Sequence, residues 1–101
     1  MNENASMFRQ VAEQIADLYE AKNSDYGDTF SKTMDKFGLV AADCRLCDKF
    51  GRFENIVLSG KDISVTSESL QDTLKDLAAY SIMTICWMSS QTSQDEENAK
   101  K

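Results

Sequence analysis

The chain of 101 residues contains no proline, and this absence constrains its fold more than any other feature. Proline breaks helices and marks turns, so a chain that lacks it can form long uninterrupted helices. Apolar residues recur at helical spacing in three segments: Ala5 to Lys22, Leu39 to Val57, and from Ser67 or Ser69 to Ser90. We therefore predict an all-α fold with three long helices.

The connections between these segments suggest one small domain. Thr29 to Phe37 has room for a short fourth helix, stopped at Gly38, and Ser59 to Thr66 is expected to be a linking loop. Residues 1–90 form the predicted domain. The polar residues 91–101 form a tail that we expect to be disordered.

The last predicted helix carries more apolar surface than a three-helix monomer can cover. One row comprises Ala79, Met83 and Trp87, and a separate stripe comprises Leu70, Leu74, Leu77, Ile85 and Met88. A chain of this size buries only about 60–65% of its unfolded surface. We therefore expect a homodimer or higher oligomer, with this helix at the interface and the helical bundle completed by oligomerisation.

Composition excludes several classes of function. The formal net charge of −6 argues against binding a nucleic-acid polymer, which depends on cations that neutralise phosphates. No segment resembles a signal peptide or reaches the ~20 apolar residues of a membrane span. Three cysteines and no histidine suggest a reducing cytoplasm. Cys44 and Cys47 lack the partners of a zinc site, so we predict them to be small packing residues.

Charged residues gather on two of the predicted helices. Arg45, Asp48 and Arg52 share a face of the second long helix, with Lys49 beside them. Glu68, Asp72 and Asp76 recur every four residues on the third, and such a row of acids is costly unless cations lie among them. The pattern favours a site for a divalent metal ion and phosphate.

Each group also has an ordinary structural interpretation. The two arginines and Asp48 could form a surface ladder of ion pairs. Asp72 could complete a capping box with Ser69. The segment KNSDYGDTF, residues 22–30, could be a simple turn in which the acids bind nearby amides.

Three ordered blocks resemble the nucleotide-modification-associated domain family 1, a family of small proteins common in phages and their bacterial hosts. The blocks are KNSDYGD at residues 22–28, RLCDK at residues 45–49 with Arg52, and ESLQDTLKDLAAY at residues 68–80. The resemblance spans roughly residues 10 to 88 and implies a nucleotide more firmly than a reaction. A more distant similarity is to the all-α MazG-like and dimeric dUTPase-like nucleoside triphosphate pyrophosphohydrolases.

The resemblance implies a role for each candidate residue. The carboxylates of Asp72 and Asp76, with Glu68 as a further metal ligand and Asp48 as a further catalytic acid, would hold Mg²⁺ and serve the chemistry. Lys49, Arg52 and Lys22 would neutralise phosphate charge. Tyr26 would stack on a base or sugar, and Asp25 would accept hydrogen bonds from it.

Two functions follow from these roles. One is hydrolysis of a nucleoside triphosphate to monophosphate and pyrophosphate. The other is non-catalytic binding of a (deoxy)nucleotide or a nucleotide-derived molecule, as an accessory to nucleotide modification or a phage sponge for a host signal. The distant relatives carry an ExxE motif, and its replacement here by Asp48 with basic neighbours favours the binder. The row of acids favours the enzyme.

Overall fold

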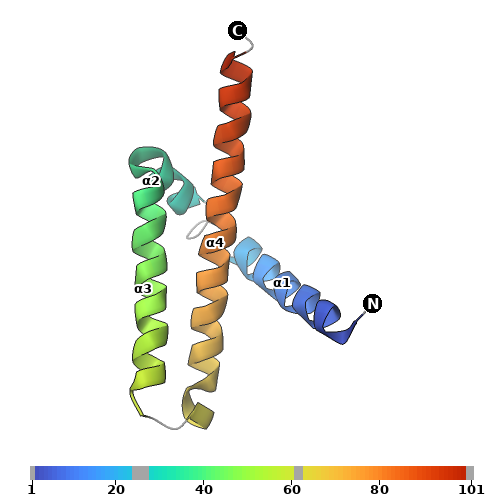
Figure 1. Cartoon of the computed structure of the whole chain (residues 1–101), viewed down its shortest axis with the longest axis vertical. Helices are drawn as coiled ribbons and strands as arrows, with labels where there is room; N and C mark the ends of the chain where they lie inside the picture. Colours follow the sequence, from blue (N-terminus) through green and yellow to red (C-terminus); the bar gives the residue numbers. More distant parts are fainter. Residues whose placement is uncertain (1, 24–27, 61–62, 100–101) are drawn as a thin grey trace.

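The computed structural model describes residues 2–23, 28–60 and 63–99, the last range with backbone alone at 63–68 and 94–99. It contains α1 (Glu3–Ala21), α2 (Thr29–Phe37), α3 (Leu39–Leu58) and α4 (Ile63–Ala99) (Figure 1). No strand occurs in these ranges. The predicted all-α fold is therefore confirmed. None of the helices in the same ranges combines the length and apolar character needed to cross a membrane.

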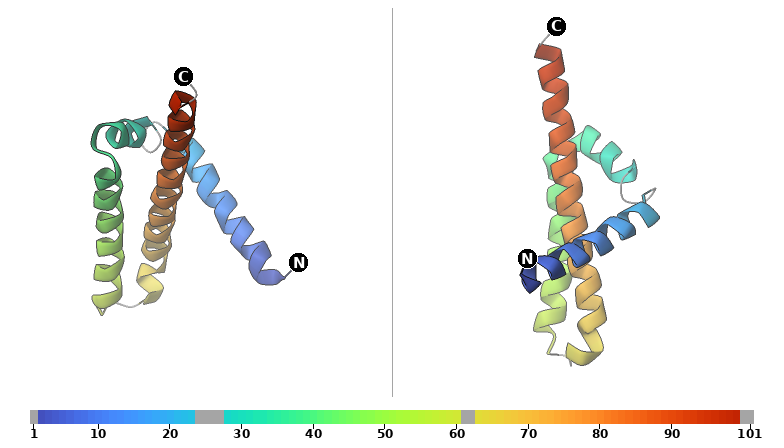
Figure 2. Two further views of the ribbon diagram at one scale, coloured as in Figure 1. Left: turned by 45° about the horizontal axis from the view of Figure 1, so that its top comes forward. Right: turned by 90° about the vertical axis from the view of Figure 1, so that its right-hand side faces the viewer.

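The helices α3 and α4 run side by side in opposite directions and form the body of the molecule (Figures 1 and 2). The short helix α2 lies across the end of this pair that is opposite the α3–α4 connection. The helix α1 crosses α4 near the middle and then diverges from it toward the N-terminus, as Figure 1 and the left view of Figure 2 show. The arrangement is open, because α1 touches the rest of the molecule mainly near its C-terminal end.

The core lies where α2 meets the beginning of α3, the C-terminal half of α1 and the middle of α4. It consists of Ile15, Phe30, Met34, Ala41, Ala42, Ala79, Tyr80 and Met83. Met34 is fully buried, and the rings of Phe30 and Tyr80 meet edge to face with centroids 5.3 Å apart. The indole Nε1 of Trp87 also donates a hydrogen bond of 2.9 Å to Asp35, which ties α4 to α2. One of the two predicted apolar rows of α4 is therefore covered within the monomer.

Local sequence explains where α1 begins and where α2 gives way to α3. The side chain of Asn2 accepts a hydrogen bond of 2.6 Å from the backbone N–H of Ala5 and so caps α1. Gly38 separates α2 from α3 with φ of 70° and ψ of −154°, a combination that is essentially restricted to glycine. Its N–H donates to the carbonyl of Met34 at 2.7 Å and closes the last turn of α2.

The boundaries of α4 differ from the prediction at both ends. The helix begins at Ile63, so the expected loop Ser59–Thr66 is too long, and it continues to Ala99 rather than ending near Ser90. The reason is that residues 63–99 contain neither proline nor glycine. Gln, Glu and Ala in the C-terminal part are good helix formers, so nothing in this stretch stops the helix.

Candidate functional site

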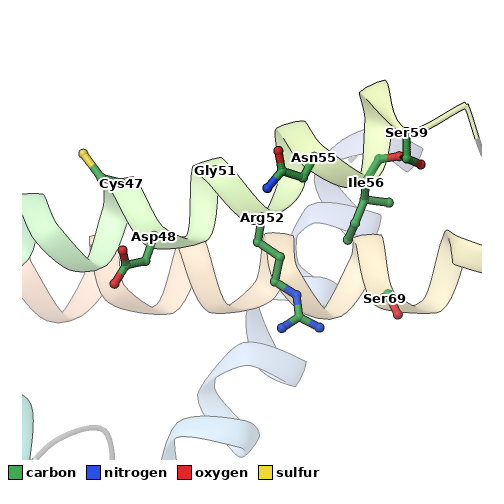
Figure 3. Close-up of a pocket in the computed structure, with 8 residues that line it drawn as sticks. All are labelled: Cys47, Asp48, Gly51, Arg52, Asn55, Ile56, Ser59 and Ser69. Atoms are coloured by element: carbon green, nitrogen blue, oxygen red, sulfur yellow. The ribbon is translucent and has the colours of Figure 1, made fainter.

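A cleft of about 710 Å³ opens along the half of α3 that leads toward α4 (Figure 3). Ser69 contributes from α4, and the α3 residues that line the cleft are Cys47, Asp48, Gly51, Arg52, Asn55 and Ile56, with Ser59 at the end of that helix. Its lining combines a cation, an amide, hydroxyls and a carboxylate. Such a set of groups can bind a polar ligand.

Asp48 and Arg52 are the two predicted site residues that line this cleft. They lie four residues apart on α3, about one helical turn, and point to the same side of the helix in Figure 3, whereas Cys47 points to the other. Both side chains are exposed, and in the described part of the chain Asp48 forms no ion pair with Arg45 or Arg52. The surface ladder of ion pairs is therefore not formed among the described residues.

Lys49 and Asp76 bind each other. The Nζ of Lys49 lies 3.2 Å from Oδ2 of Asp76, in a salt bridge and hydrogen bond that joins α3 to α4. The two side chains are 28% and 24% exposed. This pair shows which faces of α3 and α4 meet. It also pairs Lys49, a predicted phosphate ligand, with Asp76, a predicted metal ligand.

Helical spacing places Asp72 on the same side of α4 as Ser69 and Asp76. It sits between Ser69, which lines the cleft, and Asp76, which contacts Lys49. The spacing of three and then four residues keeps all three on one side of the helix. The capping-box interpretation of Asp72 is wrong, because Ser69 lies inside a helix that begins at Ile63.

The remaining predicted residues lie elsewhere or outside the described side chains. Lys22 is the exposed residue at the C-cap of α1 and does not line the cleft. Asp25 and Tyr26 fall outside the described residues, and Glu68 is described by its backbone alone, within α4. Their roles stay predictions.

The acids of the cleft region suit Mg²⁺ chemically, because Mg²⁺ prefers oxygen ligands and often takes only one or two carboxylates beside phosphate oxygens and water. Asp72 and Asp48 offer exposed carboxylates on facing helices. Among the described side chains, no three acids, cysteines or histidines converge as a metal-binding group. Any metal held here would therefore take much of its coordination from a ligand.

The cysteines are wrongly predicted as packing residues, because Cys44 and Cys47 are both exposed on α3. The Sγ of Cys47 donates a hydrogen bond of 3.5 Å to Oδ1 of Asp43. That hydrogen bond, together with the negative charge of Asp43, raises the pKa of the Cys47 thiol above its usual range.

A second cavity, of about 510 Å³, was not predicted. We call it the wedge cavity, because it lies between α1, α2 and α4 close to the crossing of α1 and α4. Its apolar lining comprises Ala12, Ile15, Ala16, Tyr19, Ala79, Ile82, Met83, Cys86 and Trp87, and polar groups at Glu20, Ser31, Asp35, Ser90 and Gln91 complete it. Ala12 and Ala16, next to the apolar residues of α1, could have indicated a close helix contact. The angle at which α1 crosses α4, which opens the cavity, cannot be predicted from the periodicity of the sequence.

Comparisons of this chain with protein-family models, with curated proteins and with solved structures find no match. The function is therefore argued from the residues and their arrangement.

Proposed function

We propose that this chain binds a nucleotide or a nucleotide-derived phosphorylated molecule in the cleft between α3 and α4. The observation that carries the proposal is the exposed guanidinium of Arg52 in a cleft of about 710 Å³. Binding pockets for small molecules commonly have volumes of roughly 300–1,000 Å³, so the cleft is large enough for a nucleotide.

The polar side chains of the cleft, together with Asp72 of α4, each have a proposed role in binding. Arg52 donates paired hydrogen bonds to phosphate oxygens, which suit its planar guanidinium. The amide of Asn55 and the hydroxyls of Ser59 and Ser69 can bind sugar or base. Asp48 in the cleft and Asp72 on α4 would be ligands for a cation that binds together with the phosphates. Mg²⁺ is the cation expected here, and it would neutralise part of the negative charge of the phosphates.

The resemblance to the nucleotide-modification-associated family supports the same ligand class, since its second and third blocks supply Asp48, Arg52 and Asp72. The salt bridge between Lys49 and Asp76 favours a binder over an enzyme. It occupies a carboxylate that a hydrolase would use to hold metal.

A second candidate is hydrolysis of a nucleoside triphosphate, in which water adds to the α-phosphorus and pyrophosphate leaves. The observation that favours it is that Asp72 and Asp76 lie four residues apart on one side of α4, the helix that pairs with α3, where Asp48 is exposed. Water attack needs a base, and Asp48 or Asp72 would accept its proton.

Titration calorimetry with a panel of ribo- and deoxynucleotides, with and without Mg²⁺, tests the proposal. We expect Arg52→Gln to weaken binding about tenfold to a hundredfold, the usual effect of removing a charged hydrogen-bond donor from a ligand. Arg45→Gln is the matched control, because Arg45 is equally an exposed arginine of α3 but does not line the cleft.

Equal loss of affinity in both arginine variants would indicate only diffuse electrostatic attraction and contradict a site in the cleft. Pyrophosphate release is measured in the same mixtures. Stoichiometric retention without release identifies a binder, and multiple turnovers identify the hydrolase.

A further inference from the structure

The apolar stripe of α1 is only half covered by the rest of the chain. Ile15 is buried in the core and Tyr19 is half-buried beside it. Phe8 and Val11 continue the same side of the helix toward its N-terminus. Phe8 is nevertheless 75% exposed and Val11 37% exposed, because α1 has diverged from α4 at this point (Figure 2). One continuous stripe thus begins in the core and ends in solvent.

A second apolar surface is exposed on α4 next to the crossing. Ile82 is 47% exposed and also lines the wedge cavity, while Ile85 is 62% exposed on the adjoining side of the helix. Met88 continues this surface one turn beyond Ile85. The exposed parts of α1 and α4 therefore border the same incompletely filled region.

The solvent-accessible surface of the single chain is larger than expected for a compact monomer of its mass. The chain exposes 7631 Å². A compact monomer of 11.3 kDa exposes only about 5,700 Å² by the usual scaling of surface with mass. The excess, on the order of 1,900 Å² per chain, exceeds the ~800 Å² that each partner buries in a standard interface and matches an obligate one.

The dimensions of the chain agree with this excess. Its radius of gyration is 16.4 Å, against about 13 Å for a compact domain of 100 residues. Together, the excess area and the continuity of a core stripe into solvent identify the occupant, because a surface that continues the protein's own core is best covered by the same kind of surface.

We infer that a second copy of this chain packs on the α1–α4 face, with Phe8 of one copy seated against the exposed α4 surface of the other, so that the wedge cavity is closed. A two-fold axis satisfies both surfaces at once, since each copy offers one α1 stripe and one α4 surface. This inference does not depend on the nucleotide proposal, because the cleft between α3 and α4 shares no lining residue with the wedge cavity.

Sedimentation of purified wild-type protein and two variants tests the inference. We expect the wild type to sediment as a dimer at micromolar concentration. Phe8→Asp should weaken association by at least about tenfold, because it places a charge in an apolar contact twice per dimer. Leu58→Asp is the matched control, since Leu58 is also 75% exposed but lies at the end of α3, away from α1. Phe8 is exposed in the single chain, so Phe8→Asp should retain its helical circular dichroism.

Cysteine alkylation gives a second readout that does not depend on sedimentation. Cys86 is exposed in the single chain and lines the wedge cavity, whereas Cys44 is exposed on α3. We expect Cys86 to react more slowly than Cys44 in the wild type and to gain reactivity in Phe8→Asp. Cys44 is the better reference thiol, because the carboxylate of Asp43 raises the pKa of Cys47 and lowers its thiolate fraction.

A monomeric wild type with reactive Cys86, or identical association of the Phe8→Asp and Leu58→Asp variants, would overturn the inference. A monomer whose Cys86 becomes protected only when an apolar dye is added would also overturn it. That outcome would assign the wedge cavity to a small molecule.

Discussion

At the scale of single residues, the salt bridge between Lys49 and Asp76 contributes modestly to the free energy of unfolding. The two side chains are about a quarter exposed, at 28% and 24%, so solvent screens their attraction only in part. Fully exposed pairs contribute about 0.2–1 kcal/mol, and a partly covered pair that joins two helices belongs near the upper end of that range. The pair is more important as a fixed contact between α3 and α4 than as a source of stability.

Asp72 and Asp76 should therefore differ in their effect on folding although they lie one turn apart. We expect Asp76→Asn to lower the free energy of unfolding by about 0.5–1 kcal/mol, because it removes the partner of Lys49. Asp72 is exposed and forms no ion pair with the described residues, so Asp72→Asn should change stability by less than about 0.5 kcal/mol. Urea denaturation followed by circular dichroism measures both.

The nucleotide affinity of the same variants completes this comparison. Asp72→Asn should weaken Mg²⁺-dependent nucleotide binding while leaving the midpoint of urea unfolding unchanged. A larger loss of stability in Asp72→Asn than in Asp76→Asn would show that Asp72 has a structural role, and its assignment to the ligand site would then be wrong.

At the scale of elements, the turn between α2 and α3 depends on one glycine. Gly38 has a φ of 70°, which side chains of L-residues rarely adopt, although a Cβ built there meets no atom within 4 Å. The restriction is thus a matter of backbone conformation and not of space. Gly51, by contrast, lies inside α3, and a Cβ there also meets no atom within 4 Å.

Alanine at these two positions should have opposite effects. We expect Gly38→Ala to lower the free energy of unfolding by about 1–3 kcal/mol, the cost of a strained backbone conformation. Gly51→Ala should raise it by up to about 1 kcal/mol, the difference in helix propensity. Thermal unfolding of the two variants checks the signs. A stabilised Gly38→Ala variant would contradict a connection of α2 to α3 through a residue with positive φ.

Sequence patterns predicted the elements better than their arrangement. The C-terminal end of α2 follows from Gly38, and the shared face of Asp48 and Arg52 follows from helical spacing alone. The contact between Lys49 and Asp76 could not be predicted, because it depends on the register of two helices that are separated by a loop. The predicted end of α4 near Ser90 is wrong, because a change to polar composition does not end a helix that no proline or glycine interrupts.

At the scale of the whole molecule, the chain separates two sites along α4. The cleft reaches α4 at Ser69, and the wedge cavity begins at Ala79. Ten residues of helix place these points roughly 15 Å apart. A single nucleotide bound beside Arg52 would therefore leave the apolar α1–α4 face accessible to a second copy. Ligand binding and assembly should be separable by mutation.

This separation makes the position of the bound ligand the most informative property of the molecule. The central claim is that a nucleotide occupies the cleft between α3 and α4, and an amide chemical-shift map recorded by NMR during titration with the tightest-binding member of the nucleotide panel tests it most directly. We predict that the largest shifts fall at Asp48, Arg52, Asn55 and Asp72, and that those at Ala16 and Trp87 in the wedge cavity stay small. Shifts centred on Ala16 and Trp87, or no saturable shift with any nucleotide of the panel, would contradict the account.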